Sequence, residues 1–211
     1  NAMPKILHGQ TDIYVLTDLR LSRGRQLEEV ADKLLSSGIH ILQYREKRLP
    51  AGKMLEECRM LREMTRKANA CFIVNDHIDI AMLAGADGVH IGQDDLPVEE
   101  VRRLVGPDII IGLSTHSPEQ ARAAAGADYI GVGPIFATQT KEDVVDPVGF
   151  EYLDWVVANI DLPFVAIGGI KEHNIGEVAA HGAKCCALVS ELVGAPDIAE
   201  KVRKLRKAMR S

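Results

Sequence analysis

Two cations of this chain have the spacing needed to bind a phosphorylated substrate. Arg45 and Lys47 are two residues apart, directly after an apolar run. If a strand continues that far, both side chains point to the same face, where they could clamp a phosphate or a diphosphate. The alternative is a surface ion pair with Glu46 or another neighbour.

Two carboxylates are placed where they could bind a metal ion. Asp76 and Asp95 follow two consecutive apolar runs. Neighbouring parallel strands lie about 5 Å apart, so carboxylates at their ends could share one hard cation. Mg²⁺ binds through one or two carboxylates and keeps its other positions for water and phosphate oxygens. The alternative is helix capping, which is common for Asp and suits Asp94-Asp95 before Leu96-Pro97.

Glycine and serine residues later in the chain are typical of a second anion site. Gly168-Gly169 and Ser190 each follow an apolar run. Backbone N–H groups at such turns can face a phosphate, and glycine permits close approach. A plain strand-to-helix turn is the alternative.

The longest connection, residues 133–149, contains hydroxyl and cationic side chains at Thr138, Thr140 and Lys141. Long loops of this kind are commonly lids or binding loops, and we expect residues 138–143 to close over substrates. A disordered loop without function is the alternative. His77 and His116 could carry protons, although a lone histidine at the start of a loop is more often structural.

Eight short apolar runs, each followed by a helical pattern, must position these residues. The strands are expected at residues 12–17, 40–44, 71–74, 88–91, 109–113, 129–132, 164–167 and 185–189. Their continuous apolar character is typical of parallel strands covered on both faces. The alternation predicts a single-domain α/β protein with the (β/α)₈ (TIM) barrel fold, and an open doubly wound sheet is the alternative. The expected helices span residues 27–35, 54–68, 78–84, 98–105, 118–125, 150–158, 175–180 and 198–208.

In this arrangement the polar clusters all lie at the carboxyl ends of the strands, where barrel enzymes carry their chemistry. A short repeated motif precedes three of the expected strands: Gly85-Ala-Asp87, Gly126-Ala-Asp128 and Gly182-Ala-Lys184. It supports a repeated βα unit, because glycine there suits a left-handed helix end.

Composition limits the function classes. The chain of 211 residues is 46% hydrophobic and 26% charged, with a mean hydropathy of -0.01 and a net charge of -5. These values indicate a folded globular protein and argue against nucleic-acid binding, and no apolar run approaches the roughly 18 residues of a membrane span. Asn1 and Ala2 precede Met3 and look like a cloning remnant, so we expect the barrel to span residues 4–211.

The cysteines predict a reducing environment. Cys58, Cys71, Cys185 and Cys186 have no CxxC spacing and lie among apolar residues, so we expect buried, reduced thiols. No secretory signal follows Met3, which favours the cytoplasm.

Several longer motifs occur in order along the chain, and through them it resembles the thiamin phosphate synthase (thiamin-phosphate pyrophosphorylase) family over nearly its whole length. They are Tyr14-Val-Leu-Thr-Asp18, Gln43-Tyr-Arg-Glu-Lys47, Val74-Asn-Asp76, Gly85-Ala-Asp-Gly-Val-His-Ile-Gly-Gln-Asp-Asp95, Gly112-Leu-Ser-Thr-His116, Gly131-Val-Gly-Pro-Ile-Phe-Ala-Thr-Gln-Thr-Lys141 and Ala166-Ile-Gly-Gly-Ile170.

The resemblance implies a Mg²⁺-dependent transferase of thiamin biosynthesis. It would couple 4-amino-2-methyl-5-(diphosphooxymethyl)pyrimidine with 4-methyl-5-(2-phosphooxyethyl)thiazole, giving thiamin phosphate and diphosphate. Asp76 and Asp95 would bind Mg²⁺. The substrate-binding residues would be Gln43, Tyr44, Arg45, Glu46, Lys47, Asn75, Ser114, Thr138, Gln139, Thr140, Lys141, Gly169, Val189 and Ser190. Among them, those with catalytic roles would be Arg45, Lys47, Ser114 and Lys141.

The implied chemistry is dissociative: diphosphate leaves first, and the thiazole nitrogen attacks the resulting pyrimidinylmethyl cation. This needs charge stabilisation and no protein nucleophile. Two alternatives remain, a thiazole tautomerase that uses His116 and a non-catalytic thiamin or phosphate-ester binding protein. One departure from the family pattern, Lys184-Cys-Cys186, precedes the phosphate end of the site. The expected partners are small-molecule substrates, without nucleic acid or membrane, and formation of a homo-oligomer is left open.

Overall fold

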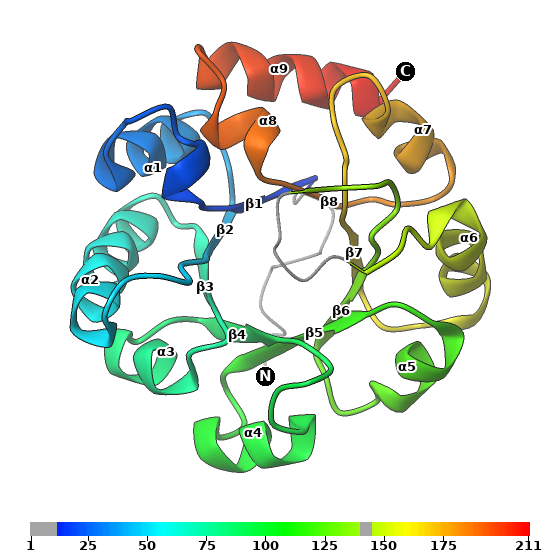
Figure 1. Ribbon diagram of the computed structural model, residues 1–211, viewed down its shortest axis with the longest axis horizontal. Coiled ribbons are helices and arrows are strands. Elements are labelled where there is room, and N and C mark those ends of the chain that lie inside the picture. Colours follow the sequence, from blue (N-terminus) through cyan, green and yellow to red (C-terminus); the bar gives the residue numbers. More distant parts are fainter. Residues whose placement is uncertain (1–11, 140–144) are drawn as a thin grey trace.

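The computed structural model describes residues 12–139 and 145–211, and in this part of the chain eight parallel strands close into a barrel (Figure 1). Each strand pairs with the next, and β8 pairs with β1 to complete the ring. The predicted (β/α)₈ barrel is confirmed, and the open-sheet alternative is wrong. The strands are β1 (Ile13–Leu16), β2 (Ile41–Tyr44), β3 (Cys71–Asn75), β4 (Gly88–Ile91), β5 (Ile110–Thr115), β6 (Tyr129–Val132), β7 (Phe164–Ala166) and β8 (Cys186–Leu188).

Helices surround the barrel on its outer side (Figure 1). In α2, the buried Met54, Cys58, Leu61 and Thr65 recur every three or four residues, as expected of a helix packed on one face. None of the helices in residues 12–139 and 145–211 has the length and apolar character of a membrane span. They are the 3₁₀ turn η1 (Leu19–Leu21), α1 (Leu27–Ser36), α2 (Ala51–Lys67), α3 (Ile78–Ala84), α4 (Val98–Val105), α5 (Pro118–Ala123), α6 (Gly149–Asn159), α7 (Ile175–Ala180), α8 (Ser190–Val193) and α9 (Ile198–Met209).

Apolar side chains form two layers, one inside the barrel and one between the strands and the helices. Along β1, Tyr14 and Leu16 belong to the inner layer, while Ile13 and Val15 belong to the outer layer. Because both faces of each strand are covered, the strands are apolar at nearly every position. The inner layer consists of Tyr14, Leu16, Ile41, Ile73, Ile110, Tyr129, Val165, Cys185 and Ala187.

The two cysteines before the phosphate end of the site fit into these layers. Cys185 is buried inside the barrel and Cys186 outside it. Burial raises the pKa of the Cys186 thiol to about 12 and that of Cys185 well above its usual range. Cys186 stays in register with Ile13 of β1. The departure from the family pattern is therefore accommodated in the core. The prediction of buried thiols is confirmed for Cys58 as well, whereas Cys71 is half-buried.

The repeated Gly-Ala-Asp motif ties adjacent strands together. The Asp87 carboxylate accepts hydrogen bonds from the backbone N–H of Phe72, at 2.7 Å, and from Arg62. Asp128 repeats this arrangement with the N–H of Ile111, at 2.8 Å, and with Arg102. In each case the aspartate lies directly before one strand and accepts a hydrogen bond from a backbone N–H of the neighbouring strand. The motif therefore stabilises the barrel at the end opposite to its chemistry.

Candidate active site

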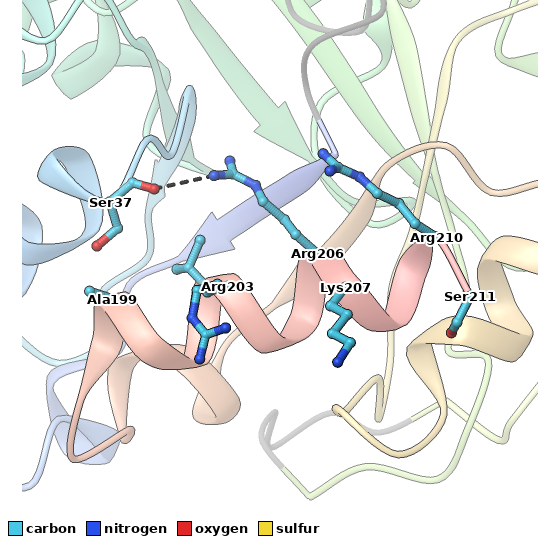
Figure 2. Close-up of a pocket in the computed structure, with 8 residues that line it drawn as sticks. Ser37, Ala199, Arg203, Arg206, Lys207, Arg210 and Ser211 are labelled. Carbon is cyan, nitrogen blue, oxygen red and sulfur yellow. Dashed lines mark hydrogen bonds between the residues drawn. The ribbon is translucent and has the colours of Figure 1, made fainter.

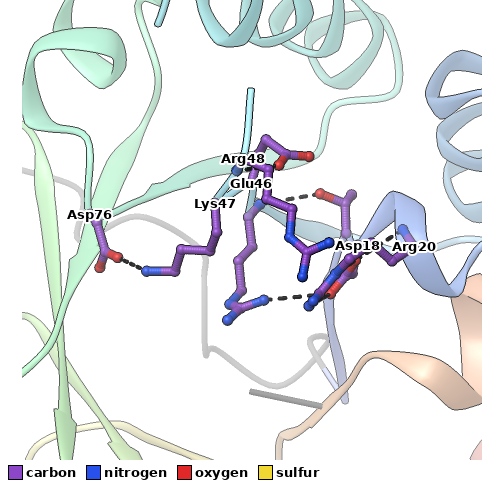
Figure 3. Close-up of polar contacts among 8 residues, drawn as sticks. Asp18, Arg20, Glu46, Lys47, Arg48 and Asp76 are labelled. Carbon is purple, nitrogen blue, oxygen red and sulfur yellow. Dashed lines mark hydrogen bonds and ion pairs between the residues drawn. The ribbon is translucent and has the colours of Figure 1, made fainter. Parts of the chain in front are cut away.

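The residues that follow the eight strands form one end of the barrel, called here the strand-end rim. Arg45 follows β2, and its side chain is only 7% exposed. Its Nη1 lies 3.5 Å from Oδ2 of Asp18, which follows β1, and its backbone N–H donates to Thr17 Oγ1. Asp18 also accepts from Arg20 Nε and Nη2, at 3.1 and 2.9 Å (Figure 3). A buried carboxylate thus lies between two guanidinium groups.

Lys47 points to the opposite neighbour of β2. It forms an ion pair with Asp76, which follows β3 (Figure 3). β2 ends at Tyr44, so the strand does not continue to place Arg45 and Lys47 on one pleated face, and that premise was wrong. The alternative, an ion pair with Glu46 or another neighbour, is borne out for the neighbour: Lys47 pairs with Asp76, while the Glu46 carboxylate accepts from the backbone N–H of Arg48. Both cations lie at the rim, each beside a carboxylate of a neighbouring strand.

Asp76 has a backbone conformation that few non-glycine residues adopt. Its φ is 62°, and its N–H donates to the carbonyl of His90 at the end of β4. Such backbone strain persists where surrounding structure holds it, often at functional sites. The preceding Asn75 is half-buried and pairs in register with His90.

Neither predicted metal ligand caps a helix. α4 begins after Pro97 without a side-chain cap, and α3 begins after His77 without one. The Asp95 carboxylate instead accepts from the N–H of Gly92, at 2.7 Å, within the loop after β4. The capping alternative for Asp95 is therefore wrong.

This pair fits Mg²⁺ better than a metal held entirely by protein. No group of three or more His, Cys, Asp or Glu side chains suited to a metal occurs in the described part of the chain. Asp76 and Asp95 follow β3 and β4, which pair directly. Two carboxylates with room for water and phosphate oxygens match the ligand set of Mg²⁺, whereas a structural zinc site needs four protein ligands.

Ser114 lines a small cavity inside the barrel, below the rim. Its Oγ lies 2.8 Å from Nε2 of His90. Gln43, from β2, donates to the Tyr14 hydroxyl at 2.7 Å, while its Oε1 is buried without a partner. The cavity measures ≈ 20 Å³, space for about one water molecule.

The two histidines proposed as proton carriers differ in their surroundings. His116 Nδ1 lies 2.7 Å from the carbonyl of Gly133, so it donates there, and the His116 N–H donates to Gln120. This joins the ends of β5 and β6 and supports a structural role. His77 precedes α3 at the rim.

The second predicted anion site lies across the rim, after β7 and β8. Gly168 and Gly169 have φ values of 106° and 64°, and a Cβ on Gly169 would come within 2.7 Å of the Ala137 carbonyl. These glycines let the loop after β7 pack against the loop after β6. Val189 and Ser190 follow β8 directly, and Ser190 starts α8.

Lys171 is a cation of this second site that the sequence motifs did not single out. Its Nζ lies 3.5 Å from Ser190 Oγ, and its pairing with Glu191 is long, at 4.0 Å. Glu191 also lies 3.7 Å from Lys201 and accepts from the N–H of Glu172. The available signal was weak, a lysine two residues after the Gly-Gly pair.

Of the remaining predicted residues, Tyr44 lies away from both sites. Tyr44 points away from the barrel interior, and its hydroxyl donates to Glu57 of α2 at 2.7 Å. Tyr44 therefore belongs to the outer layer, because Gln43 takes the inward-facing position. Thr138 is half-buried and Gln139 is exposed, in the loop after β6. Thr140 and Lys141, and with them most of the expected lid, lie outside the described residues.

A larger cavity, ≈ 670 Å³, lies over α9 (Figure 2). Arg206 there donates to Asp12, which precedes β1, at 2.9 Å, and to the carbonyls of Ser37 and Gly38, which precede β2. The cavity is therefore at the amino ends of the strands, where barrel residues serve stability. Despite its size it is remote from the carboxylates of the rim, and we assign the chemistry to the rim.

Comparisons with known proteins find relatives of one kind over nearly the whole chain. The family model described as thiamine monophosphate synthase matches residues 13–192. A thiamine-phosphate synthase of Pelotomaculum thermopropionicum is 64% identical, covering 93% of this chain and 91% of the relative. One from Lawsonia intracellularis is 58% identical and covers 98% of both. The solved thiamine phosphate pyrophosphorylase of Pyrococcus furiosus is 36% identical, with a TM-score of 0.86, over 95% of this chain and 96% of that one.

Proposed function

The chain belongs to the thiamine monophosphate synthase family and is a transferase that makes thiamine phosphate, and we propose that the strand-end rim carries this reaction. One observation supports the assignment: two cationic sites lie on the same rim. Arg45 and Lys47 follow β2, while Lys171 and Ser190 follow β7 and β8. A reaction that joins a diphosphate substrate to a phosphate substrate needs two anion sites facing one space.

The diphosphate end is assigned to the cations after β2. Arg45 offers a buried, fixed guanidinium, and Lys47 a half-exposed ammonium next to Asp76. Ser114 and Asn75 would add neutral hydrogen bonds, and Gln43 would face the pyrimidine from inside the barrel. Lys141 belongs to this set by resemblance. Charge-assisted hydrogen bonds from these groups would hold the departing diphosphate.

Asp76 and Asp95 would hold Mg²⁺ beside this end. When bound, Mg²⁺ would offset the negative charge that builds up on the leaving diphosphate. Asp76 also keeps Lys47 at the rim, so its carboxylate would serve both cations. The two aspartates have no competing capping role in the structure.

The phosphate end is assigned to the loops after β7 and β8. Gly169, Val189 and Ser190 would approach the thiazole phosphate with backbone N–H groups and a hydroxyl, and Lys171 would add a positive charge. Thr138 and Thr140 would complete this end from the loop after β6.

No protein nucleophile is required. Burial raises the pKa of the cysteine thiols, so they offer no thiolate at neutral pH. The residues of the chain would instead bind both substrates, orient them and stabilise the leaving group, after which the thiazole nitrogen attacks the pyrimidinylmethyl cation. We propose that this takes place in the cytoplasm, where free thiols stay reduced.

The test is an assay of the purified protein with both substrates and Mg²⁺. We expect equal amounts of thiamine phosphate and diphosphate. Arg45→Gln should lower kcat/KM for the pyrimidine diphosphate at least tenfold, and the exposed Arg103→Gln on α4 is the matched control. Isomerisation of the thiazole without coupling, or equal effects of the two variants, would contradict the assignment.

A further inference from the structure

Five polar side chains from five strands form one hydrogen-bonded chain across the barrel interior. Gln43 Nε2 donates to the Tyr14 hydroxyl at 2.7 Å, and the hydroxyls of Tyr14 and Tyr129 lie 2.7 Å apart. The Tyr129 hydroxyl lies 2.9 Å from Nδ1 of His90, whose Nε2 lies 2.8 Å from Ser114 Oγ. We call these five residues the interior relay. Only its two ends belong to the proposed substrate site.

The relay has a direction. An amide nitrogen only donates, so Tyr14 accepts from Gln43. The O–H of Tyr14 then donates to the Tyr129 oxygen, its other hydrogen-bond partner among the described residues. Tyr129 then donates to His90 Nδ1. A neutral imidazole that accepts at one nitrogen donates at the other, so Nε2 carries the proton and donates to Ser114. The hydroxyl proton of Ser114 is left for a further acceptor.

We propose that Tyr14, Tyr129 and His90 are positioning residues that hold Ser114 as a hydrogen-bond donor toward the diphosphate. The proposal rests on the function assigned above. In the reverse direction Ser114 would donate to His90 and present only lone pairs to the anion, which would repel it. The relay therefore aligns the hydroxyl before the substrate arrives, so no reorganisation is needed during the reaction.

The other end of the relay favours the same direction. Gln43 Oε1 is buried without a partner and is an acceptor facing the interior. Reversal would turn this amide around and leave its two N–H donors unpaired instead. A substrate with an N–H group at one end and a diphosphate at the other satisfies both ends at once. An aminopyrimidine diphosphate has this pattern.

Burial keeps the two tyrosine hydroxyls of the relay protonated. Tyr14 and Tyr129 are buried, and burial raises the pKa of both hydroxyls well above the usual range. Both therefore remain protonated at neutral pH, as a one-directional chain of donors requires. The low-polarity interior also strengthens each hydrogen bond in the series.

The first test measures the tautomer of His90 in the unmodified protein by nitrogen NMR, with His90→Gln used to assign its signals. We expect a protonated Nε2 and an unprotonated Nδ1, both without ligand and with inorganic diphosphate and Mg²⁺. A proton on Nδ1 in the diphosphate-bound protein would overturn the proposal. This readout needs no turnover, so it is separate from the proposed function.

The second test compares variants. Tyr129→Phe should lower kcat about tenfold or more, the loss expected when one hydrogen bond to a charged group is no longer aligned. Tyr152→Phe is the matched control, since it removes a buried hydroxyl that bonds Thr115, at 2.6 Å, on the outer side of β5. It should change kcat less than about threefold.

A double variant distinguishes positioning from general structural damage. If Tyr129 acts through Ser114, Ser114→Ala with Tyr129→Phe should be no slower than Ser114→Ala alone. Losses that multiply would overturn the proposal. If the unmodified protein makes thiamine phosphate and Tyr129→Phe has unchanged kcat, the positioning role of the relay is wrong while the proposed function stands. If it makes none, the function fails.

Discussion

The Asp18 carboxylate lies 3.5 Å from the guanidinium of Arg45, and both side chains are buried, at 5% and 7% exposure. Asp18 follows β1 and Arg45 follows β2, so the contact joins two neighbouring strands at the rim. A buried guanidinium without a counter-charge is costly, so Arg45 depends on Asp18 for its position. Asp18 is therefore a positioning residue for the proposed diphosphate site.

Asp18→Asn should impair both stability and activity. The variant keeps the size of the side chain and one oxygen, but it removes the charge beside Arg45. We expect a loss of about 3 kcal/mol in the free energy of unfolding. We also expect kcat/KM for the pyrimidine diphosphate to fall about tenfold. Urea unfolding and steady-state kinetics measure the two effects.

The control for Asp18 is Glu29→Gln, which removes an exposed ion pair with Lys33 of 3.2 Å on α1. That change should cost less than about 0.5 kcal/mol, because exposed pairs contribute little. If both variants behave alike, Asp18 does not hold Arg45.

Asp95→Asn and Asp94→Asn separate a metal ligand from its neighbour. Both side chains are exposed, and Asn can still accept from the Gly92 N–H, so neither variant should lose much stability. Asp95→Asn should raise the Mg²⁺ concentration for half-maximal activity at least tenfold, because an amide oxygen carries no charge. Titration of activity with Mg²⁺ measures this. Equal shifts in the two variants would remove Asp95 from its assigned role.

The barrel and its rim could be predicted from the sequence, because both depend on local order. Apolar runs alternate with helical patterns, and the polar residues that follow each run must meet at one end of parallel strands. The contacts that hold the site residues in place could not be predicted in this way. Tyr14 and Tyr129 are 115 residues apart, and each stands in an apolar strand where an aromatic residue needs no special explanation.

The two cations of the rim show the same limit. Arg45 and Lys47 were expected on one face, but the strand stops before them, and the partners Asp18 and Asp76 decide where they point. Strand ends are set by tertiary contacts, which spacing alone does not give. The proximity of Lys171 to Ser190 likewise depends on how two separate loops fold toward each other.

Buried thiols should make the barrel less stable at alkaline pH. Burial raises the pKa of Cys186 to about 12, whereas an unfolded thiol ionises near 8.5. Between these values the unfolded chain binds fewer protons than the folded chain, so stability falls as pH rises. Each such thiol contributes up to about 1.4 kcal/mol per pH unit. Cys186→Ala should therefore flatten the dependence of unfolding free energy on pH between about 9 and 10.

The control is Val165→Ala, which removes buried volume from the inner layer without removing a titrating group. It should lower stability at every pH and leave the slope unchanged. Measurements stay below about pH 10, because tyrosines of the unfolded chain ionise above that value. An unchanged slope in Cys186→Ala would mean that this thiol does not stay protonated.

Lys171→Met tests the second anion site, since Met keeps the length of the side chain and removes its charge. The ammonium lies 3.5 Å from Ser190 Oγ and is 44% exposed, so the fold should tolerate the change. We expect KM for the thiazole phosphate to rise about tenfold, the usual scale for one charge-assisted hydrogen bond. KM for the pyrimidine diphosphate should stay within about twofold, because its cations follow β2 on another part of the rim. Lys184→Met, an exposed lysine before β8, is the matched control. Equal increases in both KM values would mean that Lys171 attracts both anionic substrates without binding the thiazole phosphate specifically. No increase in either KM would mean that Lys171 is not part of the phosphate site.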